Sequence, residues 1–145
     1  MMARRSSTGY TLIELLLVLT LLSGAGFVLL VKLPVQQNER NLALASTQLT
    51  QELRDTRQAA LSERTWYEVE FFYTQGFYRI IREGKRVKDV YLPKGVIIVN
   101  APTDIRFYAP GYPSMGGTIS LKAGKLTRNV IMMPVTARVR EEIVK

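Results

Sequence analysis

The side chain most able to do chemistry in this sequence is a carboxylate inside a long apolar run. From Tyr10 to Val31 the only charged residue is Glu14, and Leu, Val, Ile and Phe make up most of the rest. A charge in a membrane-spanning segment costs roughly 2.5 to 3.5 kcal/mol near the helix centre, and less near an end. Because a carboxylate in such surroundings is favourable only when it is paired, Glu14 is predicted to bind a positive group.

Other common catalytic chemistry lacks its residues. The 145 residues include no His and no Cys, which excludes the usual zinc sites, Cys nucleophiles, Ser-His-Asp triads and disulfides. Gly111, Gly116 and Gly117 match neither a phosphate-binding loop nor a dinucleotide fingerprint, so we interpret them as turn and loop residues. We therefore expect a protein without catalytic activity, cofactor or metal. A membrane-anchored enzyme is an alternative that no nucleophile-base arrangement supports.

The apolar run is long enough to cross a membrane. Its roughly 22 residues span roughly 33 Å as a helix, against a hydrocarbon core of roughly 30 Å. Arg4 and Arg5 precede it, so the positive-inside rule predicts a single pass through the cytoplasmic membrane with the N-terminus inside. A plain anchor is one alternative. A secretory signal cut near Ala25 is another, which the continuation of apolar residues to Val31 disfavours.

Residues 7–22, STGYTLIELLLVLTLL, resemble the class III signal of type IV pilins and pseudopilins. That signal has a short basic leader ending in Gly, an aromatic residue, then Thr-Leu-Ile-Glu-Leu and a long apolar helix. The resemblance implies that a prepilin peptidase cuts after Gly9 and methylates the new amine of Tyr10. It also implies that Glu14 pairs with the N-terminal amine of a neighbouring subunit during assembly. A tolerated Glu at the membrane interface is the alternative.

After the apolar run, residues 34–63 are predicted to form an amphipathic helix that continues the first one. Pro34, which cannot donate a backbone hydrogen bond, marks the boundary between the segments 10–33 and 34–63. Apolar or small residues recur every three or four positions, which is the spacing of one helix face. We expect this stripe to pack on a C-terminal domain. The stripe comprises Leu42, Ala45, Leu49, Leu53, Thr56 and Ala60.

Residues 64–145 change from a helical to an alternating pattern and are predicted to form an antiparallel β domain. About seven short strands are expected, and the first two form a hairpin around Thr74-Gln75-Gly76. The predicted fold is therefore α+β, with a long N-terminal helix packed on antiparallel sheets. The expected strands cover residues 65–72, 76–81, 87–92, 95–99, 104–109, 117–122 and 129–140.

Residues 105–140 are similar to the closing part of the GspH/FimT group of minor pseudopilins. The matching positions are Phe107, Gly111, Gly116, Gly117, Thr118, Ile119 and Leu121, whereas Ala137 stands where Gly is common in that group. The resemblance implies a leader at residues 1–9 and a subunit of a type II secretion pseudopilus or a type IV pilus. Its implied partners are prepilin peptidase, other pilin-like subunits, membrane lipid, and an assembly ATPase with its inner-membrane platform. After assembly the subunit would lie in an extracytoplasmic filament.

The chain is basic, with 20 Lys and Arg against 12 Asp and Glu, giving a net charge of +8. A cluster near the C-terminus could contact DNA phosphates, which favours a DNA-binding minor pilin of a competence pilus as the alternative function. An ordinary solvated surface is the other interpretation. The candidate DNA-contacting residues are Lys122, Lys125, Arg128, Arg138 and Arg140.

Overall fold

The computed structural model describes the backbone of residues 11–144, and the side chains of residues 11–24 and 36–144. Gly9 and Tyr10, the predicted processing residues, lie outside the described residues. The chain divides into two compact units, Met1–Val35 and Gln36–Lys145.

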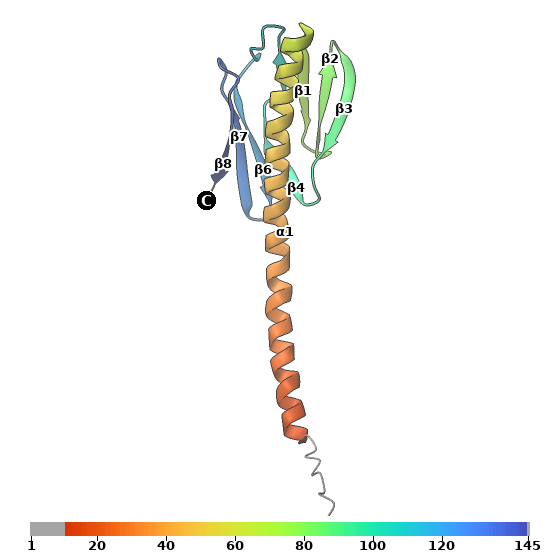
Figure 1. Cartoon of the computed structure of the whole chain (residues 1–145), viewed down its shortest axis with the longest axis vertical. Helices are drawn as coiled ribbons and strands as arrows, with labels where there is room; N and C mark the ends of the chain where they lie inside the picture. Colours follow the sequence, from red (N-terminus) through yellow and green to blue (C-terminus); the bar gives the residue numbers. More distant parts are fainter. Residues whose placement is uncertain (1–10, 145) are drawn as a thin grey trace, which may run out of the picture. The chain divides into compact units, whose positions relative to one another are not determined.

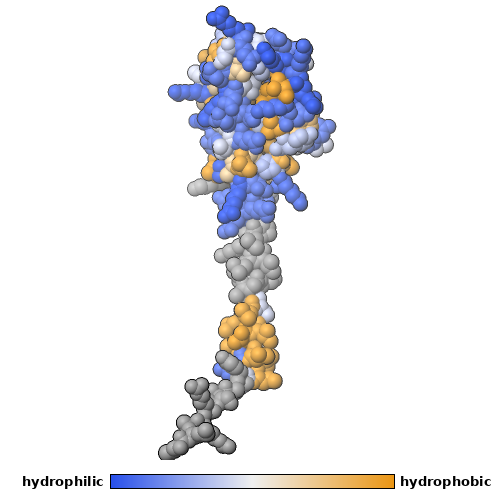
Figure 2. Space-filling model, turned by 45° about the vertical axis from the view of Figure 1, so that its right-hand side comes forward, coloured by the Kyte–Doolittle hydropathy of each residue, from blue (hydrophilic) through white to orange (hydrophobic). Residues whose placement is uncertain are grey.

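The first unit contains the N-terminal part of helix α1, Leu12–Glu63 (Figure 1). The large apolar side chains from Leu12 to Leu22 are 50–79 % exposed and form the hydrophobic surface at this end of the helix in Figure 2. The backbone stays helical through residues 33 and 34, where the sequence predicts a domain boundary. Among the residues that the structure describes, no helical segment combines the length and the apolar character needed to cross a membrane.

The second unit is built around residues 36–63 of α1, which lie across two β-sheets (Figure 1). All six residues of the predicted stripe are buried, and Leu53 and Ala60 have no exposed surface. The 3.6-residue period aligns these residues on one face, so a single helix side joins the core shared by both sheets. Lys88 on strand β3, Lys85–Tyr91, pairs with Glu52 at 2.8 Å, which fixes one sheet to the polar flank of the helix.

Among the residues that the structure describes, eight strands form two four-stranded sheets, and every pair of neighbouring strands is antiparallel. The predicted α+β fold is confirmed. The first sheet has the order β3-β2-β1-β5, with β1 at Tyr67–Phe72, β2 at Phe77–Arg82, β3 at Lys85–Tyr91 and β5 at Asp104–Phe107. The second has the order β4-β6-β7-β8, with β4 at Val96–Asn100, β6 at Gly117–Ala123, β7 at Leu126–Met132 and β8 at Val139–Val144.

The predicted hairpin is confirmed by the pairing of β1 with β2, whose closing pair is Phe72 and Phe77. Tyr67, Val69 and Phe71 alternate along β1 and are all buried in the core. Strand geometry places the residues between them on the opposite face of the sheet. The aromatic residues of β1 therefore mainly pack, as their alternation predicts.

The predicted last strand, residues 129–140, is wrong. Strand β7 ends at Met132, a turn follows, and β8 begins at Val139. Pro134 in this turn has no backbone N–H to donate to a ladder, and Ala137 adopts a left-handed φ of 51° where the chain turns. The sequence did not predict β8 as a separate strand, because only its first residue is buried. Its sequence therefore shows no alternation of apolar and polar residues.

Candidate functional site

Glu14 lies in the first turn of α1, where it closes a reciprocal cap with Thr11. The backbone N–H of Thr11 donates to Oε2 of Glu14 at 3.3 Å, and the backbone N–H of Glu14 donates to Oγ1 of Thr11 at 3.4 Å. The hydroxyl of Thr11 also donates to the same carboxylate oxygen at 3.4 Å. This is the capping-box arrangement, in which two N-terminal amides of a helix find side-chain partners.

The cap gives Glu14 a physical role within its own chain. A carboxylate in the first turn interacts favourably with the positive end of the helix dipole, an effect of roughly 0.3 to 1 kcal/mol. Glu14 is exposed, and both side-chain hydrogen bonds that it accepts go to Oε2. Among the described residues, the second oxygen, Oε1, accepts no hydrogen bond, which leaves it available to a positive group.

The basic residues predicted near the C-terminus do not form one patch. Lys122 lies opposite Thr127 near the start of β7, and Lys125 lies in the turn between β6 and β7. Arg140 lies opposite Ile131 near the other end of β7. The two lysines and the last arginines thus occupy opposite ends of the second sheet.

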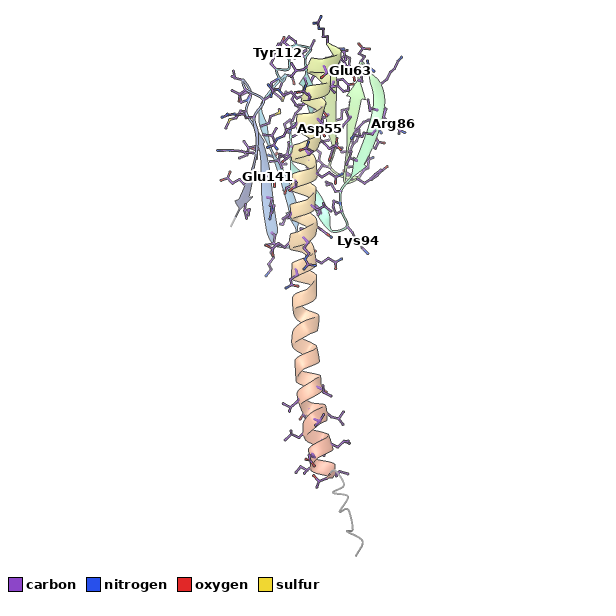
Figure 3. The ribbon with its side chains drawn as sticks, viewed as in Figure 1. Asp55, Glu63, Arg86, Lys94, Tyr112 and Glu141 are labelled. Atoms are coloured by element: carbon purple, nitrogen blue, oxygen red, sulfur yellow. The ribbon has the colours of Figure 1, made fainter. Side chains whose placement is uncertain are left out.

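Arg128 differs from the other predicted residues because, within the described part of the chain, it alone of the five forms an ion pair. Its guanidinium lies 3.8 Å from the carboxylate of Glu141, which in turn accepts a hydrogen bond from the hydroxyl of Ser46 at 2.9 Å (Figure 3 labels Glu141). These contacts connect β7, β8 and α1. Arg128 therefore has an internal partner that stabilises the packing of the second sheet on the helix.

Arg138 and Arg140 converge with two further arginines, Arg54 and Arg57 of α1, around a cleft of about 530 Å³. We call these four residues the arginine cleft. Among the described residues, the ion pairs of the chain involve none of the four. Guanidinium groups present several N–H donors in a planar fork that matches carboxylates and phosphates. The cleft is therefore suited to bind an anion.

Two of these arginines are held by backbone carbonyl groups. Arg54 donates to the carbonyl of Val139 at 3.1 Å, and Arg57 donates through Nε to the carbonyl of Gly111 at 2.9 Å. Each hydrogen bond uses one donor group, so each guanidinium keeps others. The cleft is thus positioned by contacts that fix α1 to β8 and to the loop that follows β5.

The loop that presents this carbonyl to Arg57 requires glycine at position 111. Its φ of +83° favours glycine, and a Cβ at this position would lie 2.6 Å from Cδ2 of Leu61. Gly116 is also crowded, because a Cβ there would lie 2.6 Å from Cδ of Pro134. Both glycines lie in the loop between β5 and β6, which agrees with their interpretation as turn and loop residues, and both are closely packed.

Arg54 and Arg57 are the site residues that sequence reasoning missed. Their spacing of three places them on the same side of a helix, which is a signal for a shared surface. Nothing local in the sequence connects them with Arg138 and Arg140, since the contact depends on how α1 packs on the second sheet. Within the described part of the chain, no cluster of three or more potential metal ligands occurs.

The fold and its arrangement of helix and sheets are pilin-like. The structure is similar to the minor pseudopilin EpsH from the Type 2 Secretion System of Vibrio cholerae, with a TM-score of 0.60 and 11 % identity over 71 % of this chain and 97 % of that one. It is also similar to the type IV minor pilin FimU of Pseudomonas aeruginosa, with a TM-score of 0.59 and 19 % identity over 72 % of this chain and 90 % of that one. A second crystal form of FimU gives a TM-score of 0.56. No family model and no curated protein sequence matches the chain.

Proposed function

We propose that this chain is a minor pilin or pseudopilin, a structural subunit of a type II secretion pseudopilus or a type IV pilus, and not an enzyme. The observation that carries the proposal is the fold: one helix, α1, continues into a domain of two antiparallel sheets similar to those of EpsH and FimU. The prepilin-like signal of residues 7–22 supports the same function from the sequence.

The proposed route to the filament begins in the cytoplasmic membrane. The residues before Gly9 stay inside, and the domain after residue 33 lies outside. Prepilin peptidase removes residues 1–9 and methylates Tyr10. The assembly ATPase and its membrane platform then drive extraction of the subunit into an extracytoplasmic filament of pilin-like subunits. The apolar side chains of residues 12–22, which are exposed in the isolated chain, would be covered by lipid before assembly and by neighbouring helices afterwards.

Glu14 is the proposed assembly residue. Its capping bonds with Thr11 hold the carboxylate at the first turn, and Oε1 is available for the methylated amine of Tyr10 on a neighbouring subunit. A paired charge in an apolar filament core would set the axial register between two helices, because an unpaired carboxylate there is costly.

The release of filaments from cells by shearing tests whether the chain is a filament subunit. Cells that express the full chain with its companion subunits are sheared, and the filament fraction is probed for the chain. We expect the native chain in that fraction and Glu14→Val only in the membrane fraction, with the same processed mass as the native chain. A native chain that is never found with filaments would contradict the proposal.

DNA binding is the second candidate function, and the arginine cleft is the observation that favours it. Within the described part of the chain none of the four guanidinium groups forms an ion pair, so together they could neutralise several phosphates. Residues 36–145, which form a compact unit, should then bind duplex DNA with an affinity that falls steeply as salt rises. Arg138→Ala with Arg140→Ala should reduce the slope by about 1 per lost phosphate contact, whereas Lys122→Ala with Lys125→Ala should change it less. Absence of binding at low salt would reject this candidate.

A further inference from the structure

Two turns of the second sheet pack against the part of α1 with which the second unit begins. The register of β4 with β6 pairs Val96 with Ala123, so the loop before β4 and the turn after β6 lie side by side. A glycine in each of them lies against Asn38. A Cβ on Gly95 would lie 3.6 Å from Oδ1 of this residue, and a Cβ on Gly124 would lie 3.0 Å from Nδ2. The helix thus holds both turns at the same end of the domain.

The loop before β4 borders a polar pocket of about 270 Å³. Asn41 donates through Nδ2 to the carbonyl oxygen of Lys94 at 2.9 Å, which fixes the loop to the helix. Figure 3 shows Lys94 beside α1 at this end of the domain. Amide and ammonium groups supply N–H donors, so the pocket is suited to a phosphate group. We call it the amide pocket, and it is lined by Gln37, Asn38, Asn41, Lys94 and Gly95.

Three exposed lysines lie at or beside the amide pocket. Lys94 lines it, Lys125 lies in the adjacent turn, and Lys122 lies near the end of β6. Within the described part of the chain, none of the three forms an ion pair. Glu39, the carboxylate next to Asn38 in the sequence, lines a different pocket together with Arg128. This end of the domain therefore presents positive charge that no carboxylate compensates.

The chain limits how far these turns can lie from a membrane that holds its N-terminal segment. The predicted membrane-spanning segment ends at residue 33, and Asn38 comes five residues later. Five residues span at most about 18 Å even when fully extended. Because both turns lie against Asn38, the three lysines are kept near the lipid headgroups. Such a tether raises the effective concentration of each partner for the other.

We propose that the amide pocket and the three lysines bind the phosphate group of an anionic phospholipid in the cytoplasmic membrane before assembly. This inference rests on the proposed function, because it requires the N-terminal helix to be inserted. Each lysine near an anionic surface strengthens the binding by roughly fivefold. The contact holds the domain against the membrane and is broken when the subunit is extracted into the filament. DNA is the less suitable partner for these lysines, because it would have to reach them at the lipid surface.

The full-length chain reconstituted into vesicles tests this contact. The native chain has no Cys, so a fluorophore can be placed on Val144→Cys, an exposed position opposite Thr127 near the start of β7. The vesicles contain phosphatidylcholine alone or equal amounts of phosphatidylcholine and phosphatidylglycerol. Both carry the same trace of lipid with a spin label on its headgroup, which quenches nearby fluorophores. We expect stronger quenching in the anionic vesicles, and added salt should remove the difference by screening.

A second fluorophore position is the matched control for the first. Val135 is 85 % exposed and lies in the loop between β7 and β8, at the other end of the second sheet. A fluorophore on Val135→Cys should be quenched equally in both kinds of vesicle.

Lysine substitutions then identify the groups. Lys94→Gln with Lys125→Gln should lower the ratio of docked to undocked domain in anionic vesicles by at least about fivefold. Both side chains are exposed, so the substitutions should leave the fold intact. Arg64→Gln with Lys85→Gln removes the same charge from exposed residues that follow α1 and begin β3, away from the pocket. This control should not change the quenching.

The outcomes separate the hypotheses. Equal quenching of the Val144→Cys label in both kinds of vesicle, or a difference that survives the lysine substitutions, would overturn the headgroup contact. Stabilisation of the domain by inorganic phosphate without lipid-dependent quenching would assign the pocket to free phosphate and would overturn it too. So would loss of duplex DNA binding in the lysine variant with no dependence on lipid charge. An inserted chain without lipid-dependent quenching refutes only this contact, whereas a chain that does not float with vesicles refutes the proposed membrane route itself.

Discussion

Thr11 and Glu14 cap the first turn of α1 reciprocally, each accepting a hydrogen bond from the backbone amide of the other at 3.3 to 3.4 Å. This relationship divides the proposed role of Glu14 into two parts. The cap requires a hydrogen-bond acceptor at this position, and Gln can serve in a capping box as well as Glu. Pairing with an amine in an apolar core requires the negative charge.

Glu14→Gln and Glu14→Val separate these parts. We expect both variants to be processed and inserted, because neither changes the leader or lowers the hydrophobicity of the helix. Glu14→Gln should keep the cap yet fail to enter filaments, as Glu14→Val does. The measurement is the ratio of chain in sheared filaments to chain in membranes. Normal incorporation of Glu14→Gln would show that capping is sufficient and that the charge pair is unnecessary.

Gly111→Ala should destabilise the domain of residues 36–145 more than a simple turn substitution does. The new Cβ meets Leu61 at 2.6 Å, and the left-handed backbone adds strain. Gly76→Ala is the matched control, because Gly76 has a φ of +65° with no atom within 4 Å of its Cβ position. The control should cost about 1 kcal/mol, and Gly111→Ala about 1 to 3 kcal/mol beyond it. Urea unfolding of the two variants compares them directly, and equal midpoints would contradict the packing described for Gly111.

Leu53→Ala should remove much of the stability that the helix stripe provides. Leu53 has no exposed surface, whereas Leu44 on the same helix is 60 % exposed. A buried Leu→Ala substitution costs roughly 2 to 5 kcal/mol because it removes apolar contacts and leaves a cavity. Leu44→Ala should change the free energy of unfolding by less than about 0.5 kcal/mol. Similar losses of unfolding free energy in both variants would mean that the buried face of the helix does not stabilise the core.

Tyr78 makes stability depend on alkaline pH. Burial, together with the nearby Glu52, raises the pKa of its hydroxyl above the ordinary value of 10.0. The folded state keeps the hydroxyl neutral, whereas the unfolded state ionises it above pH 10. Stability is therefore intact below that pH and is lost as the pH rises toward the folded pKa, by up to about 1.4 kcal/mol per pH unit.

Tyr78→Phe tests this coupling. The hydroxyl of Tyr78 has no hydrogen-bond partner among the described residues, so its removal should not destabilise the domain at neutral pH. Above pH 10 the variant should unfold at a higher urea concentration than the native chain. If the urea midpoints of the native chain and the variant fall in parallel above pH 10, Tyr78 is not the source of the pH dependence of stability.

The periodic spacing of apolar residues made most of the fold predictable from the sequence. The stripe from Leu42 to Ala60 and the hairpin of β1 and β2 follow from the 3.6-residue and two-residue repeats of apolar side chains. The capping box was not predicted, although Thr11-Leu-Ile-Glu14 carries its signal, since Thr and Glu stand three residues apart at the start of an apolar helix.

The rest depends on contacts between distant segments. Strand β8 has an exposed, charged sequence and is held by its ladder with β7, so no local apolar pattern predicts it. The arginine cleft joins α1 to the turn before β8, and the turn itself depends on the left-handed conformation of Ala137. Packing of the helix on the second sheet decides which arginines converge, and it leaves Lys122 and Lys125 at the far end.

The measurement that tests the central claim most directly is the intact mass of the full-length chain extracted from membranes. If the chain is a pilin-like filament subunit, its mass corresponds to a chain that starts at Tyr10 and carries one methyl group on the new amine. Fragmentation should place that group on Tyr10. An unprocessed chain that still begins at Met1, or a chain cut near Ala25, would contradict the account.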